Sequence, residues 1–287
     1  MKSILRNTFK ALGIGLIFFI GVIIGGMLAS AVGLPAPALP EGTDPATMMP
    51  LLLASSFGIG AALAYLASRL IGPLALRWLA LSGFGWGLYS LNTYLDAVIY
   101  TTLDSASPYK LVMDAVAFTA AGGFAVLFFR QKTTTPQAAP RFSLSGWAWR
   151  LALAWAAFPL IYLAFGKIVE PFVIDMYRQQ MLGLTAPGWD QIIPIQMLRS
   201  LVFLLTALGV MRLWSGPRRM PWTALGVLIF LLLWAFYALQ AYWMPLDFRF
   251  AHSLEILADS LVYAGILSLL FNQREAPAAA LAASEAA

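Results

Sequence analysis

The chain has 287 residues, of which 61% are hydrophobic and only 11% charged, and its mean hydropathy is +0.79. Soluble domains carry roughly 25% charged residues, so the composition excludes a soluble protein and predicts an all-α, polytopic membrane protein. The lack of cysteine excludes disulfides and thiolate catalysis, and a single histidine excludes any site that needs two. The net charge of +5 comes without a basic domain, so we expect no nucleic-acid partner.

Apolar segments of membrane-spanning length recur eight times. The predicted spans are 11–33, 48–70, 76–100, 109–129, 146–166, 189–213, 221–243 and 247–271. In the first span, Gly21 and Gly25 form a small-xxx-small pair that permits close helix contact. Its end resembles a signal-peptide cleavage site, but its apolar run is longer than that of a signal peptide. We therefore predict eight spanning helices and leave cleavage of the first open.

A polar segment divides these spans into two halves. Residues 131–145 carry basic residues and no acid, which predicts a cytoplasmic linker between a four-helix half, 1–130, and a second one, 146–271. Residues 168–183 are too charged to span, and their apolar spacing predicts a short amphipathic helix at the extracytoplasmic interface. The Ala-rich tail, 272–287, is expected to be disordered.

Charge alternates between the predicted connections. Basic residues gather at the termini, the second and sixth connections and the linker, whereas the other connections hold Glu41, Asp44, Asp104, Asp175 and Asp190. The positive-inside rule then places both termini in the cytoplasm. We expect a multi-pass protein of the cell membrane, of the bacterial inner-membrane type, with the lipid bilayer as its first partner.

The last span carries a polar stripe. At 100° per residue, one helix face holds Arg249, His252, Glu255, Asp259 and Tyr263. Ionisable groups inside a membrane are costly and usually functional. His252, Glu255 and Asp259 are therefore the candidate catalytic residues if the protein is an enzyme.

Polar residues of the other spans fall in the same outer half of the predicted bundle. This one-sided pattern predicts a protonatable cavity that opens away from the cytoplasm. The candidate ligand-binding residues are Asn92, Asp96, Asp114, Gln196, Arg199, Arg249, His252, Glu255 and Asp259. Arg199 is the one deep cation, and its planar fork can hold two carboxylates.

An Asp with an aromatic residue four positions later recurs at Asp96, Asp114 and Asp259. An internal duplication, inverted if the third and eighth spans correspond, is one interpretation of this pattern. Chance similarity in an apolar chain is the other.

Three functions stay open. The first is transport or binding of a small solute or ion in the cavity. The second is an intramembrane enzyme that uses His252, Glu255 and Asp259 in acid–base or metal-dependent chemistry. The third is a non-catalytic assembly or sensory subunit with a structural polar network and a membrane-protein partner. We lean against an enzyme because no nucleophile elbow, phosphate loop or zinc-protease motif is present, and we expect no cofactor and no dedicated metal site.

Overall fold

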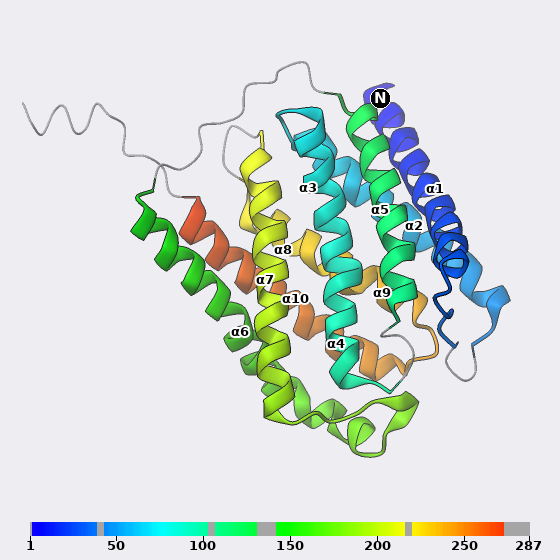
Figure 1. Cartoon of the computed structure of the whole chain (residues 1–287), viewed down its shortest axis with the longest axis vertical. Coiled ribbons are helices and arrows are strands. Elements are labelled where there is room, and N and C mark those ends of the chain that lie inside the picture. The colour runs from blue at the N-terminus through cyan, green and yellow to red at the C-terminus, as the bar shows by residue number, and fades with distance from the viewer. Residues whose placement is uncertain (1, 39–42, 103–106, 131–141, 216–219, 273–287) are drawn as a thin grey trace, which may run out of the picture.

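The computed structural model describes residues 2–38, 43–102, 107–130, 142–215 and 220–272. All named elements in these ranges are helices, and seven of them are long and apolar enough to cross a membrane (Figure 1). These seven are α1 (Lys2–Ala31), α2 (Pro45–Arg69), α5 (Pro108–Phe128), α6 (Leu144–Arg178), α7 (Trp189–Leu213), the run Trp222–Gln240 and α10 (Leu246–Phe271). The chain is therefore a multi-pass membrane protein by length and composition. Most of the predicted linker and tail lies outside the described residues.

The third predicted span is helical from end to end but changes type twice. It consists of α3 (Leu74–Trp86), a π-helical segment η1 (Gly87–Asn92) and α4 (Thr93–Tyr100). The seventh is built the same way, from α8 (Trp222–Phe230), the π segment η4 (Leu231–Ala235) and α9 (Phe236–Gln240). A π segment widens the helical turn and re-aims the side chains that follow, and such segments are frequent at functional sites.

The two halves of the chain share one helix plan. Helices α2 and α7 each have 25 residues and begin 144 residues apart, and η1 and η4 also begin 144 residues apart. Neighbouring helices close a ring in the order α1, α5, α3–α4, α7, α6, α10, α8–α9 and α2. If each helix is replaced by its counterpart in the other half, the order around the ring stays the same. This indicates two parallel repeats, related by a twofold axis that runs along the bundle.

The repeat differs from the inverted one weighed from the sequence. Asp114 and Asp259 do lie on equivalent helices, α5 and α10, but Asp96 lies on α4, whose counterpart is α9. Spans three and eight therefore do not correspond. The axis passes close to an isolated antiparallel bridge between Leu70 and Trp214, at the ends of α2 and α7.

Glycines let α1 pack closely on its neighbours. A Cβ added at Gly21 would lie 2.7 Å from Ala117 Cα of α5, and one added at Gly25 would overlap the Met113 carbonyl oxygen. A Cβ at Gly60 of α2 would likewise lie 2.6 Å from Gly15 Cα. The close contact predicted for Gly21 and Gly25 is confirmed, and its partner is α5.

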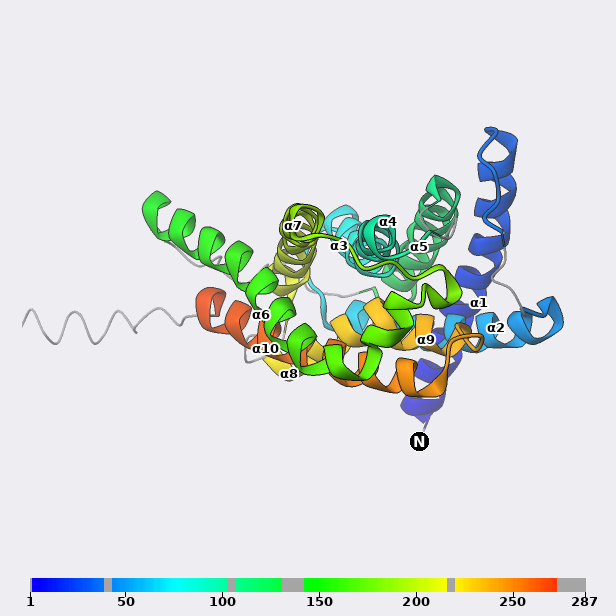
Figure 2. The same ribbon diagram turned by 90° about the horizontal axis from the view of Figure 1, so that it is seen from below.

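The boundary predicted near residue 166 is absent. Helix α6 runs without a break for 35 residues, so the separate helix expected over 168–183 is its continuation. Val169 and Val173 are buried against Phe248 of α10, which keeps this part of α6 on the bundle. Seen from below, the end of α6 and its connection to α7 lie across the lower end of the bundle (Figure 2).

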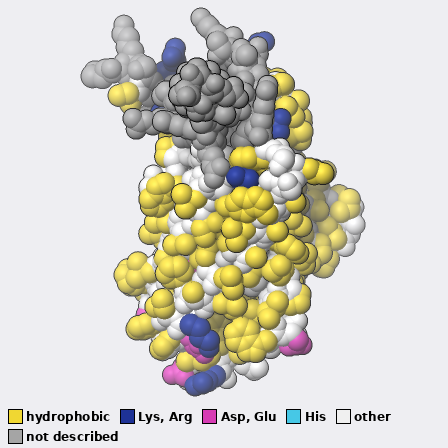
Figure 3. Space-filling model, turned by 90° about the vertical axis from the view of Figure 1, so that its left-hand side faces the viewer, with side chains coloured by type: hydrophobic (Ala, Val, Ile, Leu, Met, Phe, Trp, Pro, Cys, Tyr) yellow, Lys and Arg dark blue, Asp and Glu magenta, His cyan; other side chains and the backbone are white. Residues whose placement is uncertain are grey.

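The surface is apolar around the middle and charged at its ends. Hydrophobic side chains cover the centre of the face in Figure 3, and Lys, Arg, Asp and Glu side chains lie at its lower end. Basic residues at the end where α2 meets α3 are Lys10, Arg69, Arg77, Arg150 and Arg212, and none of the described carboxylates lies there. This distribution agrees with the alternation of charge between the predicted connections, and the cytoplasmic placement of the termini stays a prediction.

Candidate functional site

A buried guanidinium joins α7 to the third helical run. Arg199 donates from Nε to Asn92 Oδ1 at 3.0 Å, and from Nη1 to Asp96 Oδ1 at 2.5 Å. Nη1 also donates to Gln196 Oε1 one turn earlier, at 3.0 Å. Arg199 is 5% exposed, so the carboxylate and the two amides offset the cost of burying its charge. The π segment η1 ends at Asn92 and thereby helps to aim Asn92 and Asp96 at α7.

The only histidine forms a pair with a carboxylate on α10. His252 Nδ1 lies 2.7 Å from Glu255 Oε2, one turn along the helix. The imidazole is packed by Phe248 and by Trp234 of η4, with ring centroids 4.4 and 5.7 Å away. His252 Nε2 is buried and has no hydrogen-bond partner among the described residues. The pair therefore fixes one ring nitrogen and leaves the other available.

Asp259 lies one turn beyond Glu255 and is 5% exposed. Its Oδ1 forms no hydrogen bond within the described part of the chain. A buried carboxyl oxygen without a donor is costly, and this oxygen is available for a hydrogen bond from a group inside the cavity. Beyond Asp259, the Tyr263 ring contacts the rings of Phe158 and Phe203, and these rings form the aromatic floor of the site.

Three cavities meet at these side chains. Their volumes are 340, 60 and 180 Å³, and each is lined by Tyr100, Tyr177 and His252. The smallest is the inner one, and Asp259 and Tyr263 line it together with Asp96, Arg199 and Glu255. Because the three share lining residues, they lie side by side, and together we call them the branched cavity, with each of the three as one arm.

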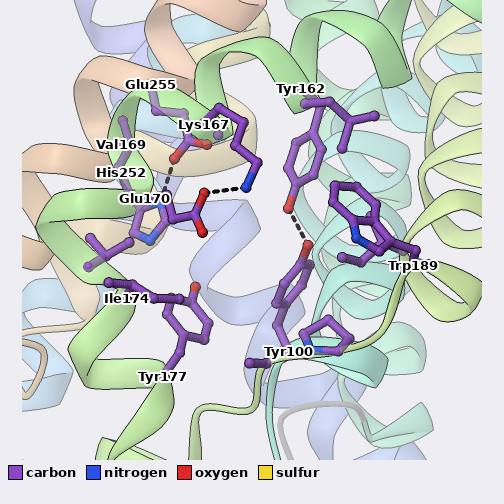
Figure 4. A pocket seen from close by; sticks show the side chains of 16 residues that line it. Tyr100, Tyr162, Lys167, Val169, Glu170, Ile174, Tyr177, Trp189, His252 and Glu255 are labelled. Carbon is purple, nitrogen blue, oxygen red and sulfur yellow. Dashed lines mark hydrogen bonds and ion pairs between the residues drawn. The ribbon is translucent and has the colours of Figure 1, made fainter.

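The largest arm of the branched cavity is aromatic. Tyr100, Tyr162, Tyr177 and Trp189 line it from α4, α6 and α7, and Figure 4 shows Tyr162 and Tyr100 joined by a hydrogen bond. Tyr162 donates this bond to the Tyr100 hydroxyl at 2.6 Å. The rest of this wall is aliphatic apart from the exposed pair Lys167–Glu170 and the His252–Glu255 pair.

The connection from α6 to α7 holds the end of α4 beside the branched cavity. Thr102 N donates to Gly183 O at 2.8 Å, and Thr185 N donates to Tyr100 O at 2.9 Å. Gln180 and Leu182 both adopt left-handed backbone conformations, with φ of 53° and 55°. Non-glycine residues rarely adopt a left-handed backbone conformation, so two of them so close together mark a strained connection. Leu182 also lines the 180 Å³ arm of the branched cavity.

Most of the sequence-predicted site residues come together here. Asn92, Asp96, Gln196 and Arg199 form one cluster, and His252, Glu255 and Asp259 line the same cavity. Asp114 instead forms an ion pair with Lys110, and Lys110 lines the 180 Å³ arm. Arg249 turns toward the Ala238 carbonyl of α9, 3.4 Å away, and does not line any of the three arms.

The aromatic wall was not predicted from the sequence. Tyr162 belongs to a span whose polar content is low, and Tyr177 was placed in an interfacial helix. The i, i+4 spacing of Phe158 and Tyr162 is a signal that could have indicated an aromatic face on α6.

The equivalent region of the first half is filled. There the rings of Phe18, Tyr89 and Phe118 pack together, with centroid distances of 4.8, 5.6 and 6.3 Å. Phe18 is the counterpart of Tyr162 at a shift of 144 residues. The space beside α6 and α10 is thus open and polar, whereas the equivalent region beside α1 and α5 holds packed aromatic rings.

Comparison of the chain with known protein families, curated proteins and solved structures gives no match. Within the described ranges, no group of three or more His, Asp or Glu side chains is arranged to hold a metal ion.

Proposed function

We propose that this protein binds a small solute in the branched cavity. The observation that supports this most strongly is the meeting of three cavities at His252, beside two buried carboxylates, one of which has an oxygen without a donor. The Arg199 guanidinium is held by three side-chain acceptors, whereas Asp259 Oδ1 has no donor among the described residues. The Arg199 cluster holds the helices together, and Glu255 and Asp259 face the ligand.

We further propose that the branched cavity opens away from the cytoplasm. The basic end of the bundle fits the cytoplasmic side of a cell membrane, with the site in the opposite half. The aromatic floor below Asp259 and the filled counterpart around Phe18 favour binding over transport, because neither provides a polar route to the basic end.

Accessibility of introduced cysteines tests this function, and the chain has no native cysteine to interfere. Ile174→Cys and Ile256→Cys place a thiol on the cavity wall, and Leu63→Cys places one in the fully buried core. In intact cells, a membrane-impermeant maleimide should label the first two variants and spare the third. Protection of both cavity positions, with labelling only after detergent is added, would contradict an outward-opening site.

Acid–base catalysis is a second candidate, favoured by the His252–Glu255 pair. If Nδ1 carries the proton and donates it to Glu255, Nε2 keeps its lone pair and can act as a general base toward a ligand. Because the chain has one histidine, labelling with ¹⁵N-histidine reads this ring alone. We expect the proton on Nδ1, and this preference should be lost in Glu255→Leu, which has no acceptor for it. An Nε2–H tautomer in the unaltered protein would remove the basis for this candidate.

A further inference from the structure

Building on the proposed function, we infer that the ligand is an organic cation, a substituted ammonium with an apolar body. Two independent features of the branched cavity carry this inference. One is an excess of carboxylates over cations, and the other is the set of aromatic rings along its largest arm.

Carboxyl groups in and around the branched cavity outnumber the basic side chains. Among the described residues that line it, the basic ones are Arg199, Lys110 and Lys167, and each already has a carboxylate partner: Asp96, Asp114 and Glu170 respectively. Glu255 and Asp259 remain, with His252 as the single group that could carry a positive charge beside them. A cationic ligand would give these two carboxyl groups a partner, whereas an anionic ligand would bring further acidic oxygens beside them.

The rings favour an alkylated ammonium over a metal ion. Tyr100, Tyr162, Tyr177 and Trp189 line an arm of 340 Å³, which is far more space than a bare ion occupies. Cations are attracted to the faces of Tyr and Trp rings, and this arrangement is typical of sites for quaternary ammonium groups. The aliphatic wall of the same arm, which includes Val173 and Ile192, provides an apolar surface for the body of the ligand.

Two sources could supply such a cation. The arm lies beside Ile168 and Phe172, which are 62% and 72% exposed on the apolar outer face of α6. A lipid with an ammonium headgroup could therefore reach the arm, as could a free amine from the aqueous side. The shared chemistry is the ammonium group, and the experiment separates the sources.

The binding of a matched pair of probes tests the inference. The probes are (4-hydroxyphenyl)trimethylammonium and its uncharged isostere 4-tert-butylphenol, titrated calorimetrically into the full chain in an uncharged maltoside detergent. We expect the cation to bind at least about tenfold more tightly, because only its charge differs. Equal binding of the two probes, or tighter binding of the neutral one, would overturn the inference.

Two sets of variants locate the effect. Glu255→Gln should weaken cation binding roughly tenfold, while Asp190→Asn, on the exposed first turn of α7, should leave it unchanged. Tyr177→Leu should weaken it roughly three- to tenfold, whereas Tyr177→Phe keeps the ring and should not. The tyrosine pair keeps the test decisive if Glu255→Gln fails to fold. An unchanged affinity in Tyr177→Leu would also contradict the inference.

Competition in nanodiscs separates the sources. Phosphatidylethanolamine should displace the cationic probe relative to phosphatidylglycerol if the ligand is a lipid headgroup, and no displacement indicates a free amine.

Failure of the inference is distinguishable from failure of the proposed function. If Ile174→Cys and Ile256→Cys label from outside but the probes bind equally, only the ammonium assignment fails. If both positions are sealed, both proposals fail.

Discussion

Ser55 and Arg199 occupy equivalent positions, 144 residues apart, and each reaches the end of the π segment in the opposite half. Ser55 Oγ donates to Phe236 O at 3.1 Å, and Arg199 Nε donates to Asn92 Oδ1 at 3.0 Å. Phe236 follows η4 directly and Asn92 ends η1. The same helix–helix contact is thus made by the Ser55 hydroxyl in one half and by the Arg199 guanidinium in the other. The charged version brings Asp96 to the branched cavity.

The polar network should separate into a structural part and a ligand-binding part. Arg199→Met removes the partner of a carboxylate and two amides, so we expect unfolding free energy to fall by about 3–5 kcal/mol. Asp259→Asn replaces a carboxyl group whose Oδ1 has no donor among the described residues by an amide of similar size, so we expect little loss of stability. Thermal unfolding in detergent measures both. A large loss in Asp259→Asn would show that Asp259 belongs to the structural network instead.

Glycine contacts of α1 should be intolerant of a single methyl group. In Gly60→Ala the new Cβ would lie 2.6 Å from Gly15 Cα, and we expect a loss of about 1–3 kcal/mol from overpacking. Gly83→Ala is the matched control, because a Cβ at that helical position meets nothing within 4 Å. It should be neutral or slightly stabilising, since alanine favours a helix more than glycine does. Equal effects of the two changes would contradict the close packing of α1 on α2.

Two isolated bridges define the ends of the bundle and can be tested by crosslinking. Leu70 faces Trp214 at one end and Thr101 faces Leu184 at the other, both in antiparallel bridges. Directly opposed residues of this kind lie close enough for a disulfide. On mild oxidation, we expect crosslinks in Leu70→Cys/Trp214→Cys and in Thr101→Cys/Leu184→Cys, read as a mobility shift that reductant reverses.

The exchanged pairs provide the control for this topology. Leu70→Cys/Leu184→Cys and Thr101→Cys/Trp214→Cys contain the same thiols at opposite ends of the bundle. Neither should crosslink within one chain. A crosslink in an exchanged pair would contradict the ring order of the helices.

Asp44 should make the entry to α2 sensitive to acid. Its carboxylate caps the helix by accepting from Ala46 N and Thr47 N, each at 3.1 Å, and from the Thr47 hydroxyl at 2.9 Å. The hydrogen bond from the Thr47 side chain holds the pKa of Asp44 below its usual value. The stabilisation is therefore complete above the ordinary carboxyl range and is lost as pH falls through the lowered pKa.

Melting temperatures across acidic pH measure this effect. Asp44→Ala should lower the melting temperature at neutral pH, and the difference from the unaltered chain should shrink as Asp44 is protonated. Asp44→Asn keeps an acceptor for the helix but does not titrate, so it should melt above Asp44→Ala by an amount that does not change with pH. A gap between Asp44→Ala and the unaltered chain that stays constant down to strong acid would argue against the cap.

The sequence by itself determined the membrane class, the helix positions and most of the polar residues that matter. Apolar runs of about 20 residues have one stable solution in a bilayer, a helix that satisfies its own backbone. The eight predicted spans therefore lie close to helical runs of the structure, seven of which are long and apolar enough to cross a membrane. Helical periodicity placed His252, Glu255 and Asp259 on one face of α10, and the cost of burying charge singled out Arg199. These are local rules, and they need only the residues concerned.

Only the tertiary structure decided how these residues are shared among partners. From the sequence, Arg199 could have paired with Glu255, Asp259 or Asp96. In the structure it binds Asp96 and Asn92, because the π segment η1 aims these two side chains at α7. Because a π segment leaves no periodic pattern in an apolar sequence, neither η1 nor η4 was predictable. The aromatic arm likewise depends on α6 continuing past residue 166, where Val169 and Val173 find buried contacts on α10 instead of a membrane surface. The helices are dictated by the bilayer, but the branched cavity exists only because helices from both halves meet around it.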